Sequence, residues 1–272
     1  MRLAVSGLDR VAAFYERSIG LEPLAPDADV TRLGADGTAV VELVPSPGAI
    51  PRPPHTTGLF HLAILVPDRV ELARALQRVL ESGWSLTGAS DHLVSEALYL
   101  SDPENNGIEI YRDRPREEWR YSNGQLEMST LPLDLGELAR ELDGDRGKRN
   151  GVPAGTGIGH VHLNVSDLDA AERFYVGLLG FEVTVRGYPG ALFVSSDGYH
   201  HHVGLNTWAG EGALPPPPQA RGLRRFELVV DGAPQLETLE RRLVEGGAPA
   251  TRTAEGIQVA DPSGNPMLLR TG

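Results

Sequence analysis

The sequence contains no cysteine among its 272 residues. This absence excludes disulfide bonds, thiolate nucleophiles and thiolate-bound metals. Any bound metal must therefore use His, Asp or Glu, which favours Fe, Mn, Co, Ni or Zn held by nitrogen and oxygen atoms.

Two further absences limit the partners that we expect. No block of five or more Lys and Arg residues offsets the formal net charge of -12, so phosphate backbones are repelled and we expect no nucleic-acid partner. No apolar run approaches the roughly 18 residues of a membrane span, and the opening MRLAVSGLDRVAAFYERS lacks the apolar stretch of a signal peptide. We expect a cytoplasmic protein without membrane contact, and the sequence leaves open whether it forms a homo-oligomer.

What the sequence does contain is a repeat. An alternating apolar strand, a helix of 3.6-residue periodicity and several short strands recur four times. The openings of these four repeats lie at residues 2–21, 58–84, 159–181 and 222–247. Two closing halves also match, since SDPENNGIEIY (101–111) parallels ADPSGNPMLLR (260–270). We predict an α+β fold built from four βαβββ units, here called repeats one to four.

The repeat is interrupted twice. Between residues 112 and 157 the pattern lapses, which predicts a linker. The segment 210–222 carries four consecutive prolines and predicts an extended spacer between repeats three and four. The predicted domains are residues 1–115, with repeats one and two, and 157–272, with repeats three and four, joined by a linker over 116–156.

With these repeats the chain resembles the vicinal oxygen chelate superfamily of glyoxalases, bleomycin resistance proteins and dioxygenases. Within it the chain is most similar in organisation to the two-domain catechol 2,3-dioxygenases of the bacillus type, over almost its whole length. The resemblance implies two open-barrel domains and one divalent metal, with ligands on the first and last strands of a repeat.

Equivalent positions of the repeats can be compared to find those ligands. The residues three positions after an opening glycine, with the counterpart in repeat one, are His61, His162, Arg225 and Arg2. On the closing strand, Glu109 corresponds to Leu268. We therefore predict that His61, His162 and Glu109 bind the metal, as the facial triad of a non-haem Fe(II) oxygenase. Mn(II) suits the same ligands.

Other interpretations of these residues stay open. His160 lies on the same face of its strand as His162 and competes for the ligand position, although the count from Gly159 favours His162. A histidine on an apolar strand is often a hydrogen-bonded core residue, and Glu109 could face outward on an edge strand.

The segment from His92 to Glu109 resembles the signature of extradiol dioxygenases. The resemblance implies that His92 hydrogen-bonds the substrate or the reacting oxygen, and that Tyr99 hydrogen-bonds the bound catecholate. In GYHHHVGLN (198–206), the family pattern matches His201, whose imidazole would take and return a proton. His200 and His202 are candidates if the register slips, and a surface histidine cluster is the alternative.

The resemblance implies an extradiol dioxygenase that uses Fe(II) and O2 to cleave a catecholic substrate to a muconic semialdehyde. One alternative is a glyoxalase-like metal-dependent isomerase or lyase, for which Glu42 is the candidate second carboxylate. Another is a metal-free resistance protein that binds an aromatic drug, because a fold alone does not determine function.

Overall fold

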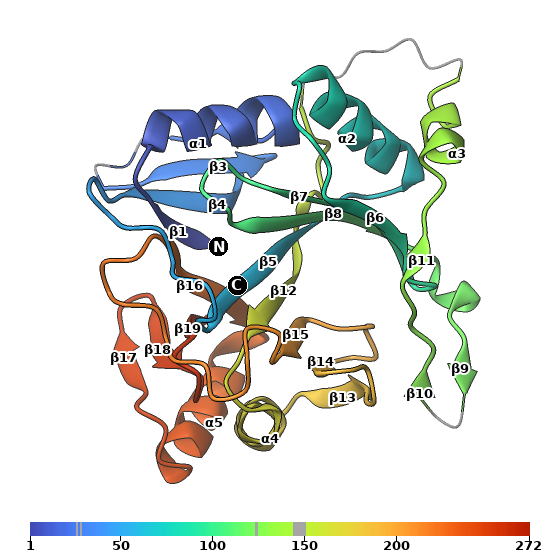
Figure 1. Ribbon diagram of the computed structural model, residues 1–272. Coiled ribbons are helices and arrows are strands. Elements are labelled where there is room, and N and C mark those ends of the chain that lie inside the picture. The colour runs from blue at the N-terminus through green and yellow to red at the C-terminus, as the bar shows by residue number, and fades with distance from the viewer. Residues whose placement is uncertain (26, 28, 123–124, 144–150) are drawn as a thin grey trace. The chain divides into compact units, whose positions relative to one another are not determined.

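The chain folds into two compact lobes. The computed structural model describes residues 1–25, 27, 29–122, 125–143 and 151–272 (Figure 1). The N-terminal lobe comprises Ala4–Ala49 and His61–His160, and the C-terminal lobe comprises Met1–Leu3, Ile50–Phe60 and Val161–Gly272. The predicted domain boundaries at residues 115 and 157 stay a prediction, and the parts of the predicted linker at 123–124 and 144–150 lie outside the described residues.

Repeats one and two and the segment after them supply the elements of the N-terminal lobe, although the first residues of β1 and β5 belong to the C-terminal lobe. They are β1 (Arg2–Val5), α1 (Leu8–Phe14), the π-helix η1 (Tyr15–Ile19), β2 (Glu22–Pro23), β3 (Thr31–Ala35), β4 (Thr38–Pro45), β5 (Gly58–Leu65), α2 (Arg69–Glu81), β6 (Gly88–Asp91), β7 (Ser95–Ser101), β8 (Gly107–Asp113), η2 (Arg116–Glu118), β9 (Tyr121–Ser122), β10 (Gln125–Leu126), β11 (Leu131–Pro132) and α3 (Leu135–Arg140). Five of the strands lie side by side in the order β11-β6-β7-β8-β5.

Repeats three and four supply the remaining elements. They are β12 (Gly157–Asn164), α4 (Leu168–Glu172), the π-helix η3 (Arg173–Leu178), β13 (Glu182–Val185), β14 (Ala191–Ser195), β15 (Val203–Asn206), β16 (Gly222–Val230), α5 (Gly232–Glu245), β17 (Thr251–Thr253), β18 (Gly256–Ala260) and β19 (Pro266–Thr271). The strand orders are β12-β15-β14-β13 and β16-β19-β18-β17.

Strand pairing confirms the predicted βαβββ repeat. The opening strand pairs in parallel with the closing strand in three repeats: β5 with β8, β12 with β15, and β16 with β19. Parallel neighbours require a crossover connection, and the helices of the repeats provide it. The fold is α+β with curled sheets that form half-barrels, as predicted. No helix in the described part of the chain is long and apolar enough to cross a membrane.

Short polar turns begin the helices, as the sequence predicts. The Asp68 side chain accepts a hydrogen bond from the Glu71 backbone N–H at the start of α2, and Asp167 caps α4 in the same way through Ala170. Each cap satisfies an N–H group that has no partner within its own helix.

A buried tyrosine of one repeat lies near an aspartate of the next in both lobes. The Tyr175 hydroxyl on η3 donates a hydrogen bond to Asp261 Oδ2 over 3.1 Å. Tyr15 on η1 is the equivalent residue, and burial together with the charge of Asp102 raises its pKa well above the ordinary value. Each aspartate lies in the Asp-Pro turn before a closing strand, so this turn joins the helix of one repeat to the strands of the next.

Glu104, two residues after Asp102, fixes the chain before α1. Its buried carboxylate accepts hydrogen bonds from the Ser6 N–H, the Ser6 hydroxyl (2.7 Å) and the Gly7 N–H (2.8 Å). In the other lobe, the Ser263 hydroxyl holds the same position and accepts from the Ser166 N–H at 2.9 Å.

The two equivalent contacts predict different losses of stability. Glu104→Ala should lower the free energy of unfolding by about 2 kcal/mol, because it removes several hydrogen bonds to a charged acceptor and leaves the half-buried donors of Ser6 and Gly7 without it. Ser263→Ala, the matched control, should cost only about 1 kcal/mol, because a neutral acceptor is lost. Urea unfolding measures both values, and an equal or smaller loss for Glu104→Ala would contradict the role of its charge.

Candidate metal centre

Strand register brings His61 and Glu109 together. β5 and β8 are parallel neighbours, with His61 opposite Gly107 and Ala63 opposite Glu109 (Figure 1). Side chains alternate along a strand, so the two residues project from the same face of the sheet. His61 Nε2 lies 2.9 Å from Glu109 Oε2.

The third member of the group is His160 on β12. Its Nε2 atom lies 3.1 Å from the same Oε2 atom of Glu109, and its ring centroid lies 5.7 Å from that of His61. The exposed fractions of His61, Glu109 and His160 are 6 %, 3 % and 3 %. One potential ligand atom from each residue lies within 4.8 Å of the others.

The electrostatics of this group fit a divalent cation. Burial raises the pKa of Glu109, but the charges and hydrogen bonds of His160 and His61 outweigh it and hold the pKa well below its ordinary value. Among the described residues, Glu109 forms ion pairs with these two histidines and with no Lys or Arg. A buried carboxylate without a compensating cation is costly, and two imidazoles with one carboxylate suit Fe(II) or Mn(II).

His162, predicted as a ligand, is not a member of this group. Its ring centroid lies 5.1 Å from that of Phe60, 5.7 Å from Phe193 and 5.3 Å from Trp208, so its neighbours are aromatic. The structure places His160 where the sequence-based prediction placed His162. The geometry favours His160 over His162, and the choice of ligand stays a prediction.

The residue at which β12 begins explains why His160, and not His162, corresponds to His61. β12 begins at Gly157, so His160 is its fourth residue, as His61 is the fourth residue of β5. Gly159 serves a different purpose, since a Cβ atom there would lie 1.9 Å from the Tyr111 hydroxyl. A count of three residues from Gly157, instead of from Gly159, would have identified His160 from the sequence.

Tyr99 and His92 form a hydrogen-bonded pair beside the group. Tyr99 lies opposite Glu109 in the register of β7 and β8, and its ring centroid lies 5.8 Å from that of His61. His92 Nε2 lies 2.6 Å from the Tyr99 hydroxyl, and His92 Nδ1 lies 2.7 Å from the Ser129 carbonyl oxygen. A carbonyl can only accept, so the neutral imidazole carries its proton on Nδ1, and Nε2 accepts from Tyr99.

The histidines at 200–202 belong to the C-terminal lobe. His201 is buried; its Nδ1 atom lies 2.8 Å from that of His200, and its ring packs on Phe193. His202 Nδ1 lies 2.8 Å from the Ser195 hydroxyl. His200 and His201 are both buried, so they do not form a surface cluster. The catalytic role of His201 stays a prediction.

Comparison with known proteins agrees with this organisation. The family model described as the Glyoxalase/Bleomycin resistance protein/Dioxygenase superfamily matches residues 1–110 and 157–268. The chain is 43 % identical over 266 residues to a protein of Bacillus subtilis (strain 168) named catechol-2,3-dioxygenase, covering 96 % of this chain and 92 % of that protein.

Two solved structures share the fold. A putative dioxygenase from Bacillus subtilis superposes with a TM-score of 0.64 at 13 % identity, covering 100 % of this chain and 83 % of the other. Glyoxalase I from Zea mays gives a TM-score of 0.59 at 16 % identity, covering 99 % and 90 %. At these identities the likeness extends to the fold alone.

Replacement of each histidine of β12 should separate the two candidate ligands. His160→Ala is expected to weaken Mn(II) binding by more than about 100-fold, since loss of even an outer partner of a metal ligand costs about 10- to 100-fold. His162→Ala is the matched control and should bind Mn(II) as the parent does. Calorimetric titration measures both affinities, and the reverse order would restore His162 as the ligand.

Proposed function

The chain belongs to the Glyoxalase/Bleomycin resistance protein/Dioxygenase superfamily, and on this premise we propose that it is an extradiol dioxygenase. The substrates would be a catechol and O2, and the product a muconic semialdehyde. The observation that carries the proposal is the buried group of His61, His160 and Glu109 beside the Tyr99–His92 pair. The 43 % identity to a protein named catechol-2,3-dioxygenase supports it.

The two imidazoles and the carboxylate would hold Fe(II) on one side, with Mn(II) as an alternative ion. When bound, the ion supplies a redox centre with open positions at which a catecholate and O2 can meet. The protein keeps the three ligands fixed, because each lies inside a strand and is almost fully buried.

Tyr99 and His92 would remove a proton from the catechol. The Tyr99 hydroxyl donates to His92 Nε2, and a phenol oxygen can at the same time accept a hydrogen bond, here from a catechol hydroxyl. As the catechol proton moves to Tyr99, the phenolic proton can pass to His92 Nε2. The Ser129 carbonyl holds His92 through Nδ1–H, so the ring does not need to turn.

His201 would act as the second acid and base, as the family resemblance implies. Its contact with His200 can fix which nitrogen carries the proton. Location in the cytoplasm and the number of subunits stay predictions.

The alternative functions have less support. Glu42, the candidate second carboxylate of an isomerase, accepts a hydrogen bond from Arg32 Nε at 3.1 Å, and an ion pair of this kind gives it a structural role. A protein that only sequesters an aromatic drug needs neither the three-residue group nor the Tyr99–His92 pair.

Oxygen consumption tests the proposed reaction. The full chain, loaded anaerobically with Fe(II) and then given catechol and air, should consume O2 and catechol in equal amounts and form a yellow ring-cleavage product. His160→Ala should lose this activity because a metal ligand is missing. Absence of O2 uptake, or turnover of a glutathione hemithioacetal instead, would reject the dioxygenase.

A double-mutant cycle tests whether Tyr99 and His92 work as one proton-transfer unit. Tyr99→Phe and His92→Ala should each lower kcat by about 100-fold, and the double variant should be no slower than the slower single variant. Tyr121→Phe, which changes an exposed tyrosine, is the control and should leave kcat unchanged. Losses that multiply in the double variant would show that the two residues act independently.

A further inference from the structure

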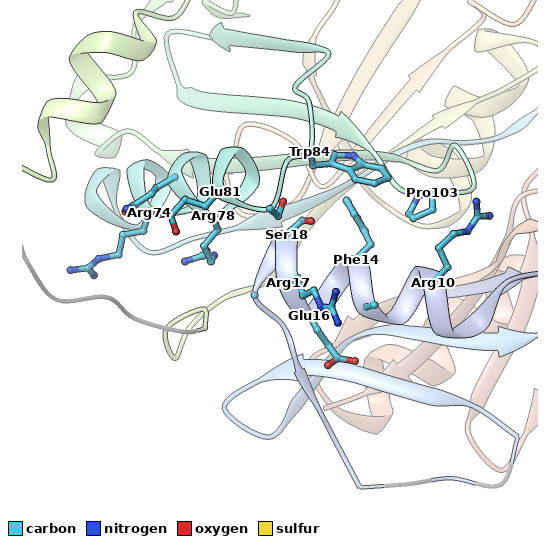
Figure 2. A pocket seen from close by; sticks show the side chains of 14 residues that line it. Arg10, Phe14, Glu16, Arg17, Ser18, Arg74, Arg78, Glu81, Trp84 and Pro103 are labelled. Carbon is cyan, nitrogen blue, oxygen red and sulfur yellow. Dashed lines mark hydrogen bonds between the residues drawn. The ribbon is translucent and has the colours of Figure 1, made fainter.

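The N-terminal lobe has a cavity that contains none of the residues discussed above as catalytic or metal-binding. It measures about 830 Å³ and lies between α1–η1 and α2 (Figure 2). This volume lies within the range of small-molecule sites, about 300–1,000 Å³. The side chains that give it its character are Arg10, Arg17, Arg74, Arg78, Phe14 and Trp84.

The four arginines differ in their ion pairs. Arg10 faces Glu104, and Arg74 pairs with Glu71. Arg78 and Arg17 form no ion pair with a carboxylate within the part of the chain that the structure describes, although the charge of Glu71 acts on Arg78 and raises its pKa against the opposite effect of burial. Two carboxylates, of Glu16 and Glu81, also line the cavity, so its four arginines leave an excess of positive charge there in a chain with a net charge of -12.

Arg78 is held in place by backbone rather than by a counter-ion. Its Nε atom donates to the Ile19 carbonyl over 3.2 Å. A Cβ atom at Gly20 would lie 2.9 Å from Nε, so the glycine leaves room for the guanidinium. The Nη2 atom is buried, with no acceptor among the described residues. Nη1 lies 3.5 Å from the Gly151 carbonyl oxygen, so Nη2 is the donor that lacks an acceptor. A buried donor without an acceptor is costly, and an anion in the cavity would offset that cost.

An aromatic wall lies beside these cations. The rings of Phe14 and Trp84 pack with centroids 4.8 Å apart (Figure 2). The Trp84 indole N–H donates to the Ser101 carbonyl over 2.8 Å, which fixes the orientation of its ring. Fixed aromatic surfaces favour a flat apolar ligand body.

We propose that this cavity binds a small planar organic carboxylate, with the carboxylate on Arg78 and the planar body beside Phe14 and Trp84. A guanidinium matches a carboxylate through two parallel hydrogen bonds. This site goes beyond the proposed ring-cleavage function, because it shares no residue with the metal centre.

Calorimetric titration of the metal-loaded full chain with benzoate tests the proposal. Benzoate should bind one-to-one, and Arg78→Met should weaken binding by about tenfold or more, because hydrogen bonds to a charged group are lost. Arg252→Met is the matched control, since Arg252 is exposed and pairs with Glu240 in the other lobe; it should bind as the parent does. Equal affinity of Arg78→Met and the parent would overturn the proposal.

Further ligands and variants separate charge, shape and location. Benzamide, the neutral counterpart of benzoate, should not bind, and inorganic phosphate, which lacks a planar body, should bind less tightly; equal binding of either would overturn the proposal. His61→Ala should bind benzoate normally, whereas loss of binding would assign benzoate to the metal centre. If Arg78→Met does not fold, Arg78→Lys keeps the charge without the planar fork and should still weaken binding, and unchanged affinity would overturn the role of Arg78.

Discussion

The burial of one carboxylate, that of Glu109, constrains the structure around it. The group is 3 % exposed, and both nearest imidazole nitrogens, on His61 and His160, approach the same oxygen atom. Burial opposes ionisation, and the two histidines reverse that effect and keep the pKa low. An ionised carboxylate in this position requires compensating positive charge. A divalent cation would satisfy this requirement, with the same three side chains as its ligands.

The surrounding core holds these three side chains in place. Ala63, Ala97 and Tyr111 are fully buried on the same face of the sheet as His61 and Glu109. The Tyr111 ring packs against His160 with centroids 4.7 Å apart, and its hydroxyl occupies the space that a side chain at residue 159 would need. One tyrosine therefore positions a candidate ligand and fixes the residue type beside it. A shift of His160 would therefore also disturb the packing of Tyr111 in the core around the candidate metal centre.

Sequence alone predicted the architecture, because the chain repeats. Internal comparison selected His61 and Glu109, which the structure brings together. On β12 it selected His162 rather than His160, because Gly157 and Gly159 both could mark the start of the strand. What separates them is the approach of Tyr111, a residue distant in the sequence, and strand periodicity cannot predict such a contact. The anchoring of His92 by Ser129 was likewise missed, because Ser129 lies in a segment with no counterpart in the other repeats.

Repeat four shows how the same strand position is used without histidine. Arg225 is the fourth residue of β16, as His61 is of β5, and it pairs with Glu227 and Glu255. Glu227 also accepts from Arg270 Nε at 2.6 Å. A guanidinium is permanently charged and satisfies nearby carboxylates by itself, whereas a neutral imidazole cannot and leaves the carboxylate dependent on a proton or a metal ion. Arg225 therefore supplies within the chain, at this strand position, the positive charge that its neighbouring carboxylates require.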